Sequence, residues 1–431
     1  MRLHIRNGRV IDPANSIDTV QEVWIEGGRI LAVGRGPERF AADRTIDARG
    51  LVVCPGLIDL GARLREPGQE HKGTIASETA AAAAGGITTV ICPPDTDPVI
   101  DTPAVANLVQ QRAQAAGHAR VLTLGALTQR LEGAQLSEMG ALKGAGCVGI
   151  GNALRPLGST LVLRRAMEYA ATHDLIVFLY ADDSALSNGG CVHEGRVGSR
   201  LGLPGIPEAA ETVAVARDLA LVQQTGVRAH FCRLSSTQAV RLVARAQYDG
   251  LPVTADVSAH QLHLTEIDVG DFDSHCHVLP PLRTQRDRDG LRAGLVKGTL
   301  AAICSDHQPH EADAKLAPFA ATAPGISALE TLLPLSLRLV HEGVMSLPEI
   351  IDRLTHRPAQ LLGLDLGTLA VGAAADLCLI DADQDWELKV EEMVSRGRNT
   401  PFVGWQFKGR AVMTIYGGRI VHELRTDQRR P

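Results

Sequence analysis

The chain has 431 residues, of which 45% are hydrophobic and 21% charged, with a formal net charge of −6. This balance is typical of a soluble globular protein, and the length suits one large α/β domain plus a smaller module. No basic stripe indicates nucleic-acid binding, and no polybasic or long apolar run indicates a membrane. The eight cysteines occur singly, without a CxxC pair. We therefore expect reduced thiols in a cytoplasmic protein.

The two ends of the chain resemble each other and predict a small β module. Residues 3–12 (LHIRNGRVID) and 413–423 (MTIYGGRIVHE) both read as a strand, a glycine-containing turn and a second strand. Asn7-Gly8 and Gly417-Gly418 are hairpin signals, and a further β-rich stretch covers 369–381. We expect a composite β-sandwich of residues 1–50 and 366–431, with residues 51–365 inserted between its two halves.

The inserted middle alternates short apolar runs with alanine-rich amphipathic stretches, such as residues 74–85 and 207–226. Eight strands that alternate with helices predict an α/β fold, a (β/α)8 barrel of the TIM type. The candidate strands are residues 51–60, 87–92, 119–125, 146–151, 175–180, 227–233, 252–257 and 300–305. In such barrels, the chemistry lies at the carboxyl ends of the strands, so these positions are the ones to compare.

The residues that end the first strand, PGLIDLGARLREPG (55–68), resemble the signature P-G-[LIF]-[IV]-D-x-H-x-H-x-R-x-P-G of dihydroorotases and related cyclic amidohydrolases. The similarity continues at residues 81–101, 194–211, 280–291, 305–319 and 399–423. The resemblance implies the metal-dependent amidohydrolase barrel. It also implies a zinc centre, which polarises the amide carbonyl and lowers the pKa of a bound water. Such a centre needs imidazole or carboxylate ligands and an open position.

The same resemblance places the family's metal ligands on side chains of another kind. The HxH pair falls on Gly61 and Arg63, the mid-barrel carboxylate on or near Asn152, the fifth-strand histidine on Tyr180 and the sixth-strand histidine on Arg233. Only the eighth-strand carboxylate is kept, as Asp306. Glycine offers no donor atom, and arginine stays protonated. We therefore expect no zinc cofactor and no catalytic residue, with Asp306 as a vestigial base position.

The substrate-binding positions also differ from the family pattern. Arg65 matches the residue that holds the substrate carboxylate, and His310 matches another substrate contact. The family's asparagine in an M-P-N-T segment is Asp95 here, and its asparagine before PPLR is Leu279. A carboxylate at position 95 would repel an anionic ligand, and leucine cannot form the hydrogen bond. The sequence thus predicts a vestigial substrate site.

Two interpretations of Asp306 stay open. It could act as a general base, or it could be a relic that is paired with an arginine. An uncompensated carboxylate in a partly buried cleft is costly. We therefore predict that Arg63 or Arg233 pairs with Asp306 and fills the former metal position.

The histidines and Arg65 leave further alternatives. His260, His307 and His310 could form a replacement metal site, or they could be loop residues that make hydrogen bonds. The triplet His275-Cys-His277 resembles an HxH motif, but it lies where the family has no ligands. Arg65 could keep an anion-binding role or only support its loop.

One bacterial branch of the family resembles this sequence in the loss of its metal ligands. The shared stretches are KGTIASET (72–79), CPP (92–94), VRAHF (227–231) and DAKLAPFAAT (313–322). The resemblance implies that this chain is a non-catalytic partner of the aspartate carbamoyltransferase catalytic chain in pyrimidine biosynthesis. It also implies a large mixed oligomer of the two chains, in which this chain also associates with itself. The alternatives are an active dihydroorotase or other cyclic amidohydrolase with a rebuilt metal centre, and a sensor that binds an orotate-like anion at Arg65.

Overall fold

Eight parallel strands form the barrel that the alternating pattern predicts. In the computed structural model, which describes residues 1–424, they follow the order β15-β14-β13-β10-β9-β8-β7-β6. Their bounds are β6 (Leu57–Asp59), β7 (Ile87–Cys92), β8 (Arg120–Ala126), β9 (Gly149–Gly151), β10 (Val177–Leu179), β13 (Ala229–Phe231), β14 (Val253–Ser258) and β15 (Ala302–Cys304). Every one of the eight predicted strand ranges overlaps one of these strands. The first and last strands are joined beyond their ends by a parallel bridge between Ala62 and His307.

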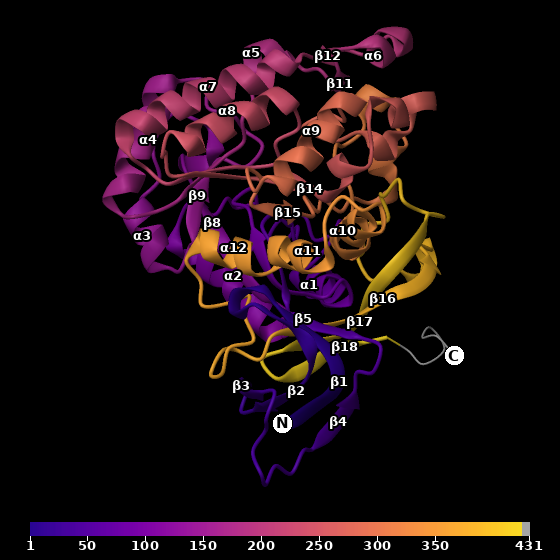
Figure 1. Cartoon of the computed structure of the whole chain (residues 1–431). Helices are drawn as coiled ribbons and strands as arrows, with labels where there is room; N and C mark the ends of the chain where they lie inside the picture. The colour runs from indigo at the N-terminus through magenta and orange to yellow at the C-terminus, as the bar shows by residue number, and fades with distance from the viewer. Residues whose placement is uncertain (425–431) are drawn as a thin grey trace.

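Helices cover the outside of the barrel (Figure 1). They are α1 (Ile75–Ala84), α2 (Pro103–Ala116), α3 (Met139–Gly144), α4 (Thr160–Thr172), α5 (Ser184–Ser187), α6 (Arg196–Leu201), α7 (Glu208–Thr225), α8 (Thr237–Tyr248), α9 (Gln285–Val296), α10 (Leu332–His341), α11 (Leu347–Leu354) and α12 (His356–Leu362). The helices α1 and α7 lie where the amphipathic stretches predict them. Thr74 caps helix α1, because its side chain accepts a hydrogen bond from the Ser77 backbone N–H, which satisfies a donor of the first turn.

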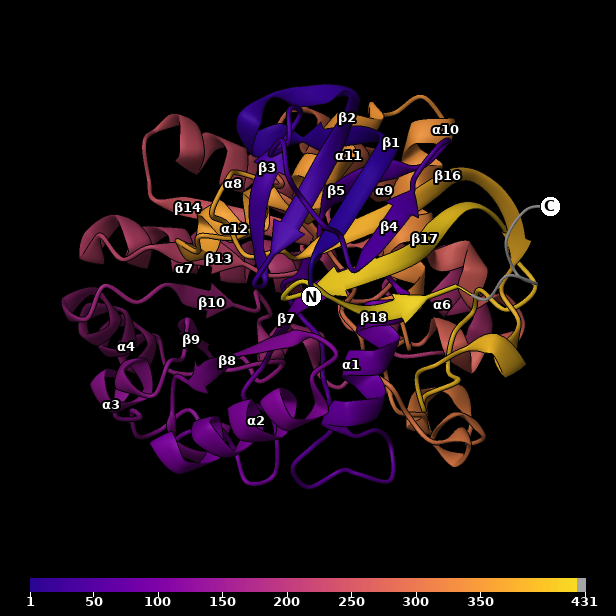
Figure 2. The ribbon, with the colours of Figure 1, turned by 90° about the horizontal axis from the view of Figure 1, so that it is seen from below.

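Strands from both ends of the chain form one eight-stranded sheet, which lies against one end of the barrel (Figures 1 and 2). These strands are β1 (Leu3–Asp12), β2 (Ile17–Glu26), β3 (Arg29–Val33), β4 (Arg44–Asp47), β5 (Val52–Pro55), β16 (Leu377–Glu387), β17 (Gln406–Tyr416) and β18 (Arg419–Glu423). The order is β18-β17-β16-β5-β1-β2-β3, with β4 paired to β1. Buried residues such as Leu3, Ile25 and Ile415 form a core of its own. The expected sandwich is thus a single hydrogen-bonded sheet. A separate small sheet contains β11 (Val192–His193) and β12 (Gly205–Ile206).

The predicted strand 51–60 is two strands, and the first of them, which follows the predicted module boundary at residues 50/51, pairs within the sheet of the module. β5 pairs with β1 and β16 in the module, whereas β6 pairs with β7 in the barrel. The chain changes sheets at Gly56, whose N–H donates to the Asp376 carbonyl over 2.9 Å. A Cβ at Gly56 would lie 2.2 Å from Thr88 Oγ1, so only glycine allows this approach. The last strand of the N-terminal half thus extends to Pro55.

The hairpin predicted at Asn7-Gly8 is also wrong, whereas the hairpin at Gly417-Gly418 is confirmed. β1 runs through Asn7, which has a φ of 65°, and its register with β2 shifts between Ile5 and Gly8. This is a β-bulge, which bends a strand without reversing it. Gly417 and Gly418 have φ of 56° and 72° and connect the paired ends of β17 and β18, as a two-residue turn requires.

The termini of the barrel strands set the position of the site. The loops that follow the carboxyl ends of β6, β7, β13 and β15 carry Arg63, Asp95, Arg233 and Asp306. Within residues 1–424, no helix combines the length and the apolar composition that a membrane crossing would need.

Candidate functional site

Asp306 lies directly beyond β15 and is almost completely buried, with 1% exposure. Its Oδ1 atom is 3.4 Å from Arg63 Nη1 and 3.3 Å from Arg233 Nη1. The Gln308 side-chain amide donates to the other oxygen over 3.2 Å. The sequence predicts one arginine at this carboxylate, and the structure has two. Asp306 is therefore held by three donors, two of them cationic.

Arg63 connects Asp306 to the second carboxylate of the site, Asp95. The Arg63 Nε–H donates to Asp95 over 2.7 Å, and the arginine is only 4% exposed. Its backbone N–H donates to the His307 carbonyl over 2.9 Å, which fixes the loop after β6 beside the loop after β15. Burial acts to raise the pKa of Asp95, but the positive charges of Arg63 and Arg65 outweigh burial and lower the pKa. Asp95 is thus an ionised partner of Arg63.

Arg233 occupies the space beside the position of the family's first histidine. A Cβ on Gly61 would lie 3.8 Å from Arg233 Nη1. On the other side, the guanidinium carbon is 5.4 Å from the centroid of the Tyr180 ring, at cation–π distance. Burial alone would lower the pKa of Arg233, but the charge of Asp306 raises it above the usual value. Burial raises the pKa of Tyr180. A protonated arginine and a neutral phenol are the result.

Asn152 follows β9 and makes its hydrogen bonds within its own loop region. It accepts from Thr128 Oγ1 over 2.9 Å and donates to the carbonyls of Leu131 and Arg155. These contacts use both donors of the amide and an acceptor lone pair. Asn152 is therefore a loop-forming residue, although it lies at a strand end as the sequence predicts.

The two retained substrate positions, Arg65 and His310, lie side by side. Arg65 Nη2 is 3.1 Å from His310 Nε2, and Arg65 Nε–H donates to the Pro309 carbonyl over 2.9 Å. Burial, and then the charges of Arg65 and Lys72, lower the pKa of His310 to about 3. Burial and then the charge of Arg63 lower the pKa of Arg65 to about 10. The arginine thus remains charged and supports the loop after β15. Leu279, half-buried, precedes Pro280 in the segment between β14 and α9.

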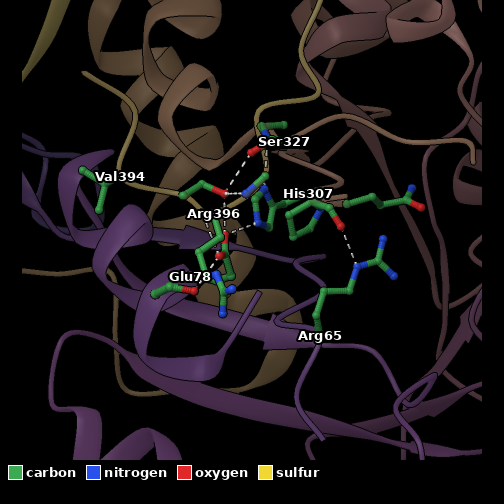
Figure 3. A network of polar contacts seen from close by, with 12 residues as sticks. Arg65, Glu78, His307, Ser327, Val394 and Arg396 are labelled. Carbon is green, nitrogen blue, oxygen red and sulfur yellow. Dashed lines mark hydrogen bonds and ion pairs between the residues drawn. The ribbon is translucent and has the colours of Figure 1, made fainter. Parts of the chain in front are cut away.

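A buried carboxylate–imidazole pair stabilises the loop next to Asp306 (Figure 3). His307 Nε2–H donates to Glu78 over 2.9 Å, and the Ala328 N–H donates to His307 Nδ1 over 3.0 Å. Because Nδ1 accepts, the proton of the neutral ring is on Nε2. Glu78 also accepts from Ser395 Oγ over 2.6 Å and from the Arg396 N–H over 3.2 Å. This network joins α1, the loop after β15 and the segment before β17. Nothing in the sequence around Glu78 indicates it.

The donor set at the former metal position does not fit zinc. Its one carboxylate, Asp306, is shared by two arginines, and His260, which lies near it, has a pKa lowered to about 4 by burial. Among residues 1–424, no three histidine, cysteine, aspartate or glutamate side chains come together as a metal site would need. His307 binds Glu78, His310 contacts Arg65, and His277 pairs with Thr322 over 2.8 Å. The structure therefore does not bring the histidines of either sequence alternative together.

Comparisons with known proteins place the chain in a family. Residues 50–239 match the family model described as dihydro-orotase-like, and residues 325–422 match the amidohydrolase family model. A "Dihydroorotase-like protein" of Pseudomonas aeruginosa is 53% identical over 98% of this chain and 100% of its own length. This chain belongs to the dihydroorotase-like family. A relative from Geobacter metallireducens called "Dihydroorotase" is 42% identical, again over 98% and 100% of the two chains.

Solved structures give the same fold for this dihydroorotase-like chain. An L-hydantoinase from Arthrobacter aurescens superposes with a TM-score of 0.88 at 24% identity, covering 98% of this chain and 96% of its own. A dihydropyrimidinase from Brevibacillus agri superposes with a TM-score of 0.85, also at 24% identity, over 98% and 95% of the two chains. The predicted amidohydrolase-type barrel with a β module is thus confirmed.

Proposed function

We propose that this dihydroorotase-like chain is a pseudoenzyme, which does not hydrolyse cyclic amides and acts as a structural partner of the aspartate carbamoyltransferase catalytic chain in pyrimidine biosynthesis. The observation that supports the loss of hydrolysis is the position of Asp306 between Arg63 and Arg233. A hydrolytic centre of this family needs a dication at that carboxylate, and two guanidinium groups stand there.

Electrostatics supports the loss of the metal. A dication about 4 Å from one arginine would be repelled by roughly 8 kcal/mol, even at an effective dielectric constant of about 20. Two arginines would add two such terms, and one carboxylate with 1% exposure cannot offset them. A general base must also reach its substrate within hydrogen-bond distance, and Asp306 is enclosed by Arg63, Arg233 and Gln308.

The structural role is supported by the similarity of the sequence to the non-catalytic branch. A barrel can persist after its chemistry is lost, because activity resides in the site and not in the fold. A rigid barrel still offers surface for another chain.

Co-expression with the carbamoyltransferase catalytic chain of the same genome tests the partnership. Light scattering after size exclusion should find both chains in one large complex, and the carbamoyltransferase alone should be smaller or less active. If the carbamoyltransferase assembles fully and is active by itself, and the two chains never co-elute, the partnership is wrong.

A second candidate function is an active cyclic amidohydrolase with a rebuilt centre. Two observations favour it: the name "Dihydroorotase" of the 42% identical Geobacter relative, and the two retained substrate positions, Arg65 and His310, which contact each other. Elemental analysis of protein purified without chelator, together with turnover of dihydroorotate in added zinc, decides between the two functions. Near-stoichiometric zinc, with turnover that is lost in Asp306→Ala, would establish the enzyme and overturn the first proposal.

A further inference from the structure

A cavity of about 400 Å³ opens at the amino-terminal ends of β13 and β14, at the opposite end of these strands from Arg233. Its walls come from the starts of these strands, from α12 and from the segment that follows α8. Ile176, Leu251 and Leu361 supply apolar surface. Apolar walls with a few polar groups are the usual composition of a small-molecule site.

The charged side chains that line the described part of this cavity are Arg228 and Arg357, and no carboxylate lines it. Arg228 contacts Asp174 with its Nη2 atom over 3.1 Å, and Arg357 contacts Asp352 with its Nε atom over 2.9 Å. The remaining nitrogens, Nε and Nη1 of Arg228 and Nη2 of Arg357, have no hydrogen-bond partner within residues 1–424. Both guanidinium groups thus keep free donors.

A third arginine lies beside a lining residue of the cavity. Arg353 is 9% exposed, and its Nη2 atom lies 3.7 Å from the position that a Cβ on Gly298 would take, where Gly298 is a lining residue. The Nε atom of Arg353 is buried and has no hydrogen-bond partner among the described residues. The ion-pair partners of these three arginines among the described residues are two carboxylates, Asp174 and Asp352.

We propose that this cavity binds a small organic oxyanion. The anionic group is held by Arg228 and Arg357, whose planar guanidinium groups match the geometry of carboxylate and phosphate oxygens. The apolar body of the ligand packs against Ile176, Leu251 and Leu361. Carboxylate and phosphate share this chemistry. The site is distinct from the Asp306 site at the carboxyl end, and it does not depend on the proposed loss of hydrolysis.

Calorimetric titration of the full chain with benzoate and with phenyl phosphate, in low-salt buffer, tests the proposal. We expect saturable binding of at least one of them at one site per chain. Arg228→Gln and Arg357→Gln should each weaken that binding roughly tenfold, because each removes a charge-assisted hydrogen bond. The matched control is Arg164→Gln on α4. Arg164 is similarly exposed, forms an ion pair with Glu168 at a distance of 3.0 Å, and does not line the cavity. This control should bind as the wild type does.

The outcomes separate the parts of the proposal. Tighter binding of benzoate supports a carboxylate ligand, and tighter binding of phenyl phosphate supports a phosphate ligand. Inorganic phosphate that binds as tightly as phenyl phosphate would overturn the role of the apolar wall. Absence of saturation by both probes, or equal affinity in the wild type and both cavity variants, would overturn the site itself.

Discussion

Replacing Asp306 with asparagine tests whether this carboxylate now serves arginines instead of a metal. Removing one partner of a buried ion pair costs about 3–5 kcal/mol. Solvent screening reduces this little, because Asp306, Arg63 and Arg233 are 1%, 4% and 7% exposed. Arg63 keeps Asp95 at 2.7 Å, so mainly Arg233 loses its carboxylate. We therefore expect Asp306→Asn to lower the free energy of unfolding by about 3 kcal/mol, the lower end of that range.

Urea unfolding of the full chain, followed by tryptophan fluorescence and circular dichroism, measures this loss. With an m value of roughly 3 kcal/mol/M, the midpoint should fall by about 1 M. Adding Arg233→Met to Asp306→Asn should recover part of the loss, because the unpaired buried charge is gone. The matched control is Asp18→Asn, which breaks a largely exposed pair with Arg9 and should cost no more than about 1 kcal/mol.

The opposite result would refute this account of the site. In an apo metal centre, carboxylate ligands repel other ligands, so asparagine would leave stability unchanged or raise it. If Asp306→Asn behaves in this way, the pairing of Asp306 with Arg63 and Arg233 does not stabilise the fold. Strictly additive effects in the double variant would likewise show that Asp306 and Arg233 are not coupled.

Three further predictions concern the surroundings of the site and the joint between the two parts. His310 has a folded pKa of about 3, set by burial and then by nearby cations. The unfolded chain binds this proton near pH 6.5, so stability is lost from pH 6.5 down toward pH 3. The loss should be about 2 kcal/mol at pH 5. His310→Asn should remove this part of the pH slope, as urea midpoints at pH 7.5 and pH 5 will show; an unchanged slope contradicts it. Gly56→Ala should destabilise by about 1–3 kcal/mol through overlap with Thr88. As a control, Gly158→Ala places a Cβ in open space and should change the free energy of unfolding by about 0.5 kcal/mol or less, as measured by thermal unfolding. Equal melting temperatures for the two variants would disprove the close approach. Glu78→Gln should cost about 1–3 kcal/mol, because it breaks the buried network around His307. A wild-type melting temperature would show that the network does not need the carboxylate.

The repeating pattern of the barrel could be predicted because it is local. Apolar runs and amphipathic stretches carry their periodicity within ten to twenty residues, and each of the eight strand ranges was predicted in the correct place. The hairpin at Gly417-Gly418 was likewise predictable from its two glycines. Asn7-Gly8 carries the same local signal, but there packing against the neighbouring strands determines the path of the chain. Gly8 packs against Val53, where a Cβ would lie 2.6 Å from the valine side chain, and the strand continues through a bulge.

The division of residues 51–60 between two sheets could not be predicted for a similar reason. Both β5 and β6 are short and fully buried, and they are apolar except for Asp59, so burial and composition do not separate them. Only their partners differ: β5 lies between β1 and β16, and β6 lies beside β7. Pairing partners that lie tens or hundreds of residues away leave no mark on the local sequence.

By itself, the sequence determined which side chains stand at the strand ends, and so it determined that arginine replaces the expected ligands at positions 63 and 233. Only the tertiary structure decided what those arginines do. Arg63 is separated from Asp306 by 243 residues and Arg233 by 73, and one carboxylate accepts both because the barrel brings the ends of its first, sixth and last strands to one place. The pairing of Arg63 with Asp95 was decided in the same way. The residue type alone gives the charge of a side chain. The partner that compensates this charge depends on which loops the fold brings within about 3 Å of it, the length of a charge-assisted hydrogen bond.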